Sequence, residues 1–287
     1  MRKFSKVALI FAAVVGVAGT AMTIGGAAMG ATIAGLNIGK YGLGKTVNKV
    51  MISTESDKNW DMDWDEINAV EPEWDGSTEV YFISRVSSLD ISLSADQLTL
   101  EEYDGDGLRV EVSGNKKNQV RVGEDEDTLV IETIGRKNDR HIRIQYPKGT
   151  KFEDTSIDVA AGTVEMQSDF QTEDLDIEVA AGEITNSGQI SSESADISVG
   201  TGNVELQNLK VADLEGDCGV GNMSLGIVGS EKDYNYEISC GAGCVQIGDN
   251  SYEGLGHDES VSNAGATGDM DLSCGIGNFE ISFSKES

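Results

Sequence analysis

The sequence predicts an all-β protein, a single-stack parallel β-solenoid of about 20 residues per coil, preceded by an N-terminal transmembrane helix. Three observations lead to this prediction. One ten-residue frame recurs six times between residues 157 and 281. The 287 residues include 35 Gly but only 2 Pro, which indicates many tight turns between short strands. Residues 7–39 carry no charge at all.

The uncharged run near the N-terminus predicts a membrane segment. Arg2, Lys3 and Lys6 precede it, and about 20 apolar residues suffice to cross the hydrocarbon core. We expect an anchor with a span at about residues 7–36 inside a region 1–52. A secretory signal peptide cleaved near Ala21 is the alternative. The bulk of the chain is then extracytoplasmic, either held at the cell membrane by one span or secreted.

A short stretch after this run matches a phosphate-binding loop in letters only. Residues 39–46, GKYGLGKT, fit G-x-x-x-x-G-K-[ST]. Such a loop needs a strand before it and a helix after it, and neither is predicted here. With 50 acidic against 21 basic residues and a net charge of -29, the chain should also be repelled by phosphate backbones. We therefore expect neither a nucleotide nor a nucleic-acid partner.

Residues 53–77 form an acidic stretch that contains all three tryptophans and predicts a linker. Trp60, Trp64 and Ile67 are spaced i, i+4, i+7, which favours a short amphipathic helix that packs on the membrane interface or on the following domain. Asp61 begins a pattern like that of a calcium loop. Because the sixth and twelfth positions hold Glu66 and Pro72 instead of Gly and an acid, we expect no calcium site.

The repeated frame dominates the rest of the chain. Its copies are IDVAAGTVEM (157–166), IEVAAGEITN (177–186), ISVGTGNVEL (197–206), GDCGVGNMSL (216–225), ISCGAGCVQI (238–247) and LSCGIGNFEI (272–281). A glycine recurs at Gly162, Gly182, Gly202, Gly221, Gly243 and Gly277. The intervals are 20, 20, 19, 22 and 34 residues, and a period near twenty indicates a repeat architecture.

Each position of the frame has a structural interpretation. Three residues before the glycine stands an apolar column that predicts a core ladder: Val159, Val179, Val199, Cys218, Cys240 and Cys274. A second apolar column follows two residues after the glycine, and polar residues lie between, as in strands with one buried face. At the glycine we expect a sharp corner that requires φ > 0. Each unit buries its apolar side by stacking on its neighbours.

The solenoid extends upstream of the clear repeats. Residues 89–100 fit the same frame with Asp96 in the glycine position, and residues 108–112, 119–122, 129–133 and 142–146 read as strands separated by turns. The domain therefore divides into a β-rich part at residues 78–150 and regular repeats at residues 151–287.

At this level the chain resembles a known family. The order of two strands, then IRIQYPKGT (142–150), then repeated I-x-V-x-x-G-x-[VI] coils behind one N-terminal membrane segment, is similar to the bacterial putative-adhesin family, a β-strand-repeat domain of unknown function. The resemblance covers roughly residues 78–284. It implies the solenoid fold and an adhesin-like role, and it supplies no active-site residues.

The four cysteines do not predict a special site. Cys218, Cys240 and Cys274 stand where earlier coils have valine, which indicates small buried hydrophobic side chains. A disulfide between Cys240 and Cys244, or a metal site, stays open, but no Cys-x-x-Cys spacing supports either one. We expect no metal and no cofactor.

Nothing in the sequence predicts catalysis. From Lys151 onward there are four lysines and no arginine, so a base for polysaccharide elimination is nearly unavailable. His141 and His257 are isolated. Outward acids such as Glu165 and Glu205 recur with the strand alternation and look like a solvated face, which leaves a polysaccharide hydrolase as the less favoured alternative.

The 34-residue interval contains the best candidate for a binding loop. Residues 249–269 extend the usual return between coils, and long loops on a rigid scaffold often bind partners. Tyr252 and His257 are the candidate contact residues, and a disordered polar loop is the alternative.

The sequence thus favours a non-enzymatic, membrane-anchored, extracytoplasmic solenoid that binds a protein or envelope partner or senses the envelope. The alternative is a structural scaffold that assembles through the ends of the solenoid. Its oligomeric state is open.

Overall fold

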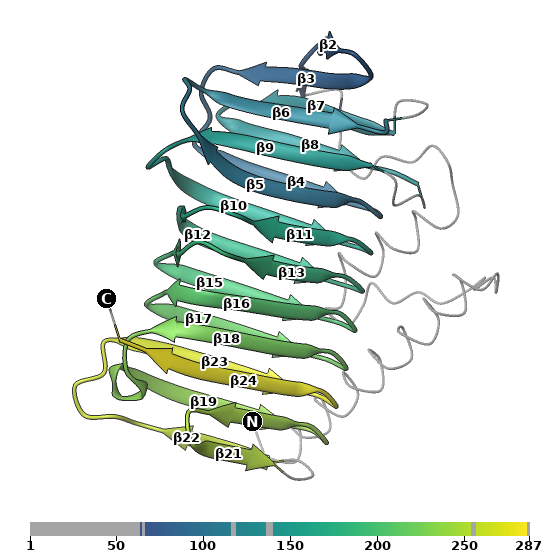
Figure 1. Cartoon of the computed structure of the whole chain (residues 1–287). Coiled ribbons are helices and arrows are strands. Elements are labelled where there is room, and N and C mark those ends of the chain that lie inside the picture. The colour runs from purple at the N-terminus through teal and green to yellow at the C-terminus, as the bar shows by residue number, and fades with distance from the viewer. Residues whose placement is uncertain (1–63, 65–66, 116–118, 136–139, 254–256, 286–287) are drawn as a thin grey trace, which may run out of the picture.

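The computed structural model describes residue 64 and residues 67–115, 119–135, 140–253 and 257–285 (Figure 1). The predicted membrane span, the phosphate-loop-like stretch and the calcium-like pattern lie outside these residues. Within them, no helix is long and apolar enough to cross a membrane. One short 3-10 helix, η1 (Glu231–Asp233), accompanies the strands.

The strands are β1 (Asn68–Ala69), β2 (Glu73–Asp75), β3 (Thr78–Ile83), β4 (Ser88–Leu93), β5 (Gln97–Tyr103), β6 (Leu108–Ser113), β7 (Val120–Asp125), β8 (Thr128–Thr133), β9 (His141–Pro147), β10 (Lys151–Val159), β11 (Thr163–Met166), β12 (Phe170–Val179), β13 (Glu183–Asn186), β14 (Ile190–Ser191), β15 (Ser194–Val199), β16 (Asn203–Lys210), β17 (Asp213–Cys218), β18 (Asn222–Val228), β19 (Tyr234–Cys240), β20 (Cys244–Ile247), β21 (Asn250–Glu253), β22 (His257–Val261), β23 (Gly268–Cys274) and β24 (Asn278–Ser284).

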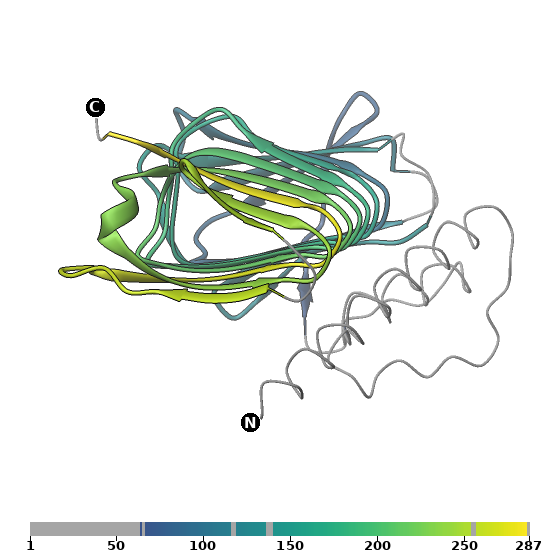
Figure 2. The ribbon, with the colours of Figure 1, turned by 90° about the horizontal axis from the view of Figure 1, so that it is seen from below.

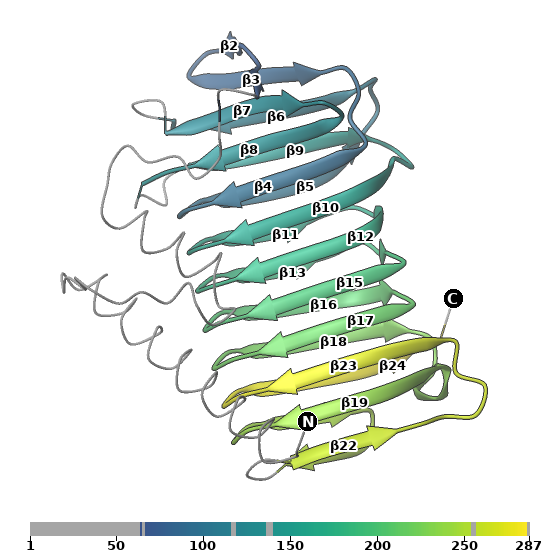
Figure 3. The same cartoon turned by 180° about the vertical axis from the view of Figure 1, so that it is seen from behind.

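All strands except β14, which pairs with β12 and β16, form two faces of one stack, as the solenoid prediction requires (Figures 1 and 3). Face 1 consists, in spatial order, of β1, β7, β8, β4, β10, β12, β15, β17, β23, β19 and β22. Face 2 consists of β2, β3, β6, β9, β5, β11, β13, β16, β18, β24, β20 and β21. Seen along the stack, successive coils superimpose (Figure 2).

The parallel strands stack in register, so that equivalent residues of the frame meet from coil to coil. Val159 pairs with Val179, and Val179 with Val199. The column continues through Cys218 and Cys274 to Cys240, and all six side chains are buried in one continuous apolar core. Alternation of apolar and polar residues therefore gives each strand one face in the core and one in solvent.

The coils do not stack in the order in which they follow one another along the chain. The coil of β4 and β5 lies between that of β8 and β9 and that of β10 and β11. At the other end, the last coil, β23 and β24, inserts between the coil of β17 and β18 and that of β19 and β20 (Figure 1). Because all coils share one frame, their positions in the stack can be exchanged without disturbing the core columns.

Both ends of the stack are antiparallel, so the prediction of an all-parallel solenoid was wrong there. At one end β7 pairs antiparallel with β8 and β1, and β6 with β9 and β3. At the other end β21 pairs antiparallel with β20, and β22 with β19. The segment 249–269, predicted as a loop, thus supplies most of a β cap. Residues 68–69 and 73–75, assigned above to the linker, are strands of the opposite cap.

The glycine column has a different cause from the one expected. Positive φ occurs at other glycines and at none of the six repeat glycines. Instead, the corners stack so closely that a Cβ on Gly182 would lie 2.6 Å from the carbonyl oxygen of Gly162. The same close approach to a neighbouring carbonyl recurs up and down the column. Glycine is required because the backbone of the next coil occupies the place of its side chain.

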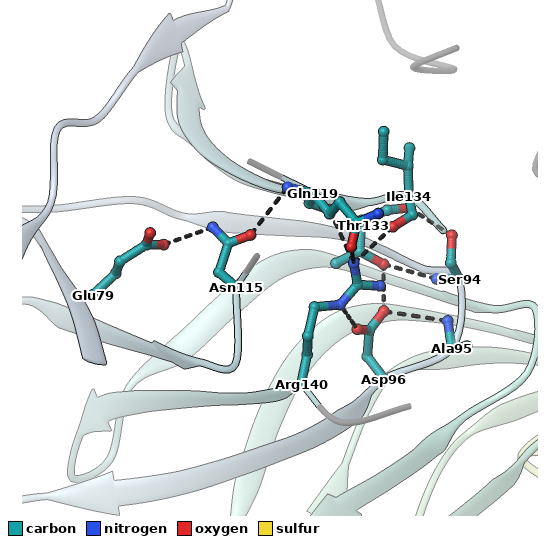
Figure 4. A network of polar contacts seen from close by, with 9 residues as sticks. All are labelled: Glu79, Ser94, Ala95, Asp96, Asn115, Gln119, Thr133, Ile134 and Arg140. Carbon is teal, nitrogen blue, oxygen red and sulfur yellow. Dashed lines mark hydrogen bonds and ion pairs between the residues drawn. The ribbon is translucent and has the colours of Figure 1, made fainter. Parts of the chain in front are cut away.

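The glycine column ends at Asp96, which stands in the glycine position of its coil and is part of a buried polar network (Figure 4). The Arg140 guanidinium donates through Nε to Asp96 Oδ1 at 2.5 Å and through Nη1 to the Ile134 carbonyl at 2.6 Å. The Thr133 hydroxyl donates to the other Asp96 oxygen. Arg140 and Asp96 are each 1% exposed. This ion pair joins the regular coils to the cap.

We predict that Asp96→Asn lowers the free energy of unfolding by about 3–5 kcal/mol, because it leaves the buried Arg140 charge without its counterion. Chemical denaturation measures this change. The matched control is Asp104→Asn, which breaks the exposed pair with Lys148 (3.0 Å) and should leave stability unchanged. Equal effects of the two substitutions would contradict the role assigned to the buried pair.

We also predict that Gly182→Ala destabilises the protein by about 1–3 kcal/mol, because the added Cβ collides with backbone of the adjacent coil. Ala181→Thr is the control at the neighbouring corner position, since the next coil carries Thr201 there. Thermal unfolding of both variants tests the argument, which fails if Gly182→Ala is as stable as the control.

Candidate binding surface

The two residues predicted for a binding loop lie on the two strands of the β cap. Tyr252 lies on β21, is half-buried against the core, and its carbonyl accepts a hydrogen bond from the Cys240 thiol at 3.2 Å. His257 begins β22, where its backbone pairs with Cys240. The segment closes the stack, and this accounts for its length without a ligand.

A long acidic column runs down face 1 instead. Five carboxylates from consecutive coils stand in register on the outside of β12, β15, β17, β23 and β19, and we call them the acidic column: Asp176, Asp196, Glu215, Asp271 and Glu237. Neighbouring strands are about 4.8 Å apart, so each carboxylate faces another of the same sign at short range.

Further acids flank this column on both sides. On the side of the strand starts lie Asp154, Asp174, Asp213 and Asp269, and on the side of the corner lie Asp158, Glu178 and Asp217. Burial and then the charges of Glu215 and Asp176 raise the pKa of Asp196 to about 6. Burial likewise raises the pKa of Asp217, with Glu215 and Asp271 adding to the effect. The face therefore holds carboxylates that repel one another.

Face 2 arranges its acids differently. Its middle outward column reads Glu165, Thr185, Glu205, Ser224, Glu280 and Gln246 in spatial order. Glutamates thus alternate with neutral residues, so that every acid has an uncharged neighbour in the next coil. At the upper end of this face, Arg143 lies 3.8 Å from Glu101 and 3.6 Å from Glu111. Charge repulsion is avoided on face 2 and maintained on face 1.

Part of the acidic face is hollowed. A groove of about 420 Å³ crosses β4, β10, β12 and β15, and its lining includes Asp90, Asp154, Asp174, Asp176 and Asp196. The neutral lining residues are mainly Ser and Thr, such as Ser156 and Ser194. A groove with this lining can accept cationic groups and hydrogen-bond donors.

The described residues contain no cluster of three or more His, Cys, Asp or Glu side chains arranged to hold a metal ion. The four cysteines are free thiols, so the structure contains no Cys240–Cys244 disulfide. Cys244 contacts the Ser251 hydroxyl at 3.3 Å across the cap.

Two described residues of the predicted amphipathic helix, Trp64 and Ile67, contact the N-terminal cap. The Trp64 indole donates to Glu132 Oε2 at 2.6 Å, and the Arg121 guanidinium lies 5.3 Å from the centre of its ring. A Cβ on Gly123 would collide with Ile67 and Trp64, so this glycine makes room for both. The end of the acidic linker is thus fastened to β7 and β8.

The acidic column is not apparent when the outward acids are considered one coil at a time. The signal was present in the aligned frames. The position three residues before the core-ladder column is Asp176, Asp196 and Glu215 in consecutive repeats, whereas the acids of the other strand alternate with Thr or Ser.

Comparison with known proteins places the chain in a family. No curated protein is detectably similar to it. Solved structures with a similar arrangement include a putative adhesin from Bacteroides fragilis (16% identity, 74% of this chain and 99% of that one, TM-score 0.44) and a putative cell adhesion protein from Clostridium sporogenes (13%, 75% and 100%, TM-score 0.37). A putative lipid binding protein from Parabacteroides distasonis is also similar (12%, 75% and 95%, TM-score 0.27).

None of these three structures is described as an enzyme, and their likeness to this chain is too low to carry its function. The sequence match is more specific, since the Toastrack DUF4097 family model covers residues 86–287. The chain therefore belongs to the Toastrack DUF4097 family, a family of unknown function.

Proposed function

We propose that this protein is a non-enzymatic binding module of the bacterial envelope, adhesin-like or envelope-sensing, held at the membrane by its N-terminal segment. Its acidic face binds a cationic protein or envelope partner. The observation that carries this proposal is the acidic column, in which five carboxylates follow one another in register on one face only.

The acidic column lowers the stability of the free protein. Like charges directly opposite on neighbouring strands are destabilising, whereas a pair of opposite charges in the same position stabilises the sheet by roughly 0.2–1 kcal/mol. Face 2 shows that the same frame accommodates neutral residues between acids, as Thr185 stands between Glu165 and Glu205. Repulsion that is kept on one face is relieved when a cationic partner binds there, which adds to affinity and steers association.

The caps argue against assembly through the solenoid ends. Each end of the stack has two edge strands, and at least one of them carries acids: β2 carries Glu73 and Asp75 at one end, and β22 carries Asp258 and Glu259 at the other. Charged side chains on an edge strand oppose pairing with a second copy. The ends are therefore protected, and the long face is the more suitable surface for interaction.

A polysaccharide hydrolase explains less of the structure. The raised pKa of Asp196 is of the kind that a general acid has. The acidic column, however, repeats one carboxylate per coil without distinguishing any pair as acid and base. A binding role accounts for the whole column.

The first prediction from this proposal concerns the triple variant Asp196→Asn, Glu215→Gln, Asp271→Asn. It should bind a fluorescent decalysine peptide at least tenfold more weakly at low salt, a loss of roughly 1.4 kcal/mol or more. Because repulsion is removed, the same variant should unfold a few degrees higher than the wild type. Fluorescence anisotropy and thermal unfolding measure the two changes.

The matched control also removes three negative charges, but from face 2. It is the triple variant Glu165→Gln, Glu205→Gln, Glu280→Gln. It should retain most of the affinity and show little gain in stability, because these acids already have neutral neighbours. If both triple variants lose affinity equally, the peptide responds only to net charge and face 1 is not a specific surface.

The N-terminal cap is the end that we place next to the membrane. Trp64 lies at this cap, where its indole donates to Glu132 on β8. Trp74 on β2 and Phe82 on β3 are 66% and 56% exposed at the same end. Aromatic side chains favour the membrane interface, and the acidic face then extends away from the bilayer surface.

Protease treatment of intact cells tests this location, with a tag after Ser287 and a cytoplasmic protein as the lysis control. We expect the tag to be lost while the control survives, because the proposal puts the solenoid on the extracytoplasmic side of the membrane, where the protease acts. A tag that is protected until the cells are lysed would contradict an extracytoplasmic binding role.

A further inference from the structure

Three cysteine thiols meet in the core at the C-terminal end of the stack. Cys218 on β17 pairs in register with Cys274 on β23, and Cys274 pairs with Cys240 on β19. Their exposures are 2%, 1% and 1%. They continue the column that valine occupies in the preceding coils, where Val159, Val179 and Val199 stand. The first cysteine of the column is Cys218, in the coil of β17 and β18. The C-terminal coil of β23 and β24 packs directly against that coil.

The geometry of neighbouring in-register strands permits a disulfide here. Adjacent strands lie about 4.8 Å apart with equivalent side chains on the same side, and disulfides join Cα atoms about 4.4–6.8 Å apart. The Cys218 sulfur already leans over the next coil, since it lies 3.8 Å from the Asn278 carbonyl oxygen. A Cβ added to Gly277, in that next coil, would lie only 3.0 Å from the Cys218 sulfur.

Cys218 and Cys274 each donate to the corner carbonyl of their own coil, at 3.2 Å to Gly221 and at 3.1 Å to Gly277. The neighbouring Cys274 thiol raises the pKa of Cys218, with burial adding to the effect, and Cys218 in turn lowers the pKa of Cys274. Cys240 instead donates to the Tyr252 carbonyl at 3.2 Å in the cap, and burial raises its pKa to about 11. Cys274 is therefore the thiol most readily deprotonated, with Cys218 as its immediate neighbour.

We propose that Cys218 and Cys274 form a disulfide in the oxidising extracytoplasmic environment and thereby lock the inserted C-terminal coil into the stack. The oxidant is a small-molecule or protein disulfide. The Cys274 thiolate attacks one of its sulfurs and releases the other as a thiolate. Cys218 then loses its proton and attacks the mixed disulfide at Cys274, releasing the second thiolate. Two protein thiols are oxidised and one external disulfide is reduced.

A disulfide between Cys218 and Cys274 would join the C-terminal coil to a coil from an earlier part of the chain. The coil of β23 and β24 is the last in the chain and is held between two coils that precede it in sequence. A bond from Cys218 to Cys274 closes a loop that contains β18 to β22 and the whole C-terminal cap. Closing so long a loop restricts the unfolded chain strongly. The inference rests on the extracytoplasmic location in the proposed function, but not on the acidic face or its partner.

Peptide mapping tests the pairing directly. In the variant Cys240→Val, Cys244→Ser only the proposed pair remains, and Cys240→Val places in β19 the residue that upper coils have in this column. The protein is refolded from urea, and separately incubated folded, with oxidised glutathione as the probe. Trypsin then cleaves after Lys210, Lys232 and Lys285. We expect a non-reduced species that joins peptides 211–232 and 233–285.

The same mapping of the wild-type protein distinguishes the pairs. Only a bond to Cys218 joins the two peptides, whereas Cys240–Cys274 or Cys240–Cys244 would stay within peptide 233–285. The oxidised form should unfold about 5–10 °C higher than the reduced form. Cys218→Val and Cys274→Val, which keep the valine of earlier coils, should abolish both the joined peptide and the shift.

Two results would overturn the proposal. One is that both cysteines remain free thiols after folded and refolded samples have been exposed to oxidised glutathione. The other is a bond that forms only within peptide 233–285, which would place the pair elsewhere in the column.

Discussion

The fold depends on the close, in-register contact of one coil with the next at the glycine corner. A Cβ on Gly182 would lie 2.6 Å from the Gly162 carbonyl oxygen, so side chains are excluded there. This contact aligns the backbone hydrogen bonds of both faces and sets every other column in register. The column ends at Asp96, where the buried Arg140 ion pair replaces close backbone packing and connects the coils to an antiparallel cap. Core, acidic face and cysteine column all follow from that alignment.

The repeat unit could be predicted from the sequence, because periodicity records what each residue faces within its own coil. Val159 and its equivalents were assigned to a column that lies in the core. The order of the coils could not be predicted, since the frames around Cys240 and Cys274 are interchangeable and only contacts between coils distinguish them. The caps escaped prediction for a related reason. Residues 250–253 have too little alternation to indicate a strand, and antiparallel pairing with β20 determines their structure.

The candidate site was missed for the opposite reason, since its residues had been noticed and given another meaning. An outward acid in a single coil is an ordinary solvated residue. Stacked in register, Asp176, Asp196 and Glu215 become a line of charge, and burial together with the charges of Glu215 and Asp176 raises the pKa of Asp196 to about 6. The same alignment brings Cys218 and Cys274 together. In a solenoid, candidate sites therefore form from columns of equivalent residues. These columns can be recognised only when the order of the coils in the stack is known.

The central claim is that face 1, and not the solenoid in general, contacts the partner. Asp196 and Glu205 lie on opposite faces of the same coil, on β15 and β16. The most direct measurement replaces each in turn by a photo-crosslinking amino acid and irradiates intact cells. The account predicts a discrete crosslinked product from position 196 that high salt abolishes, and none from position 205. Equal products from both positions, or a product from position 205 alone, would contradict it.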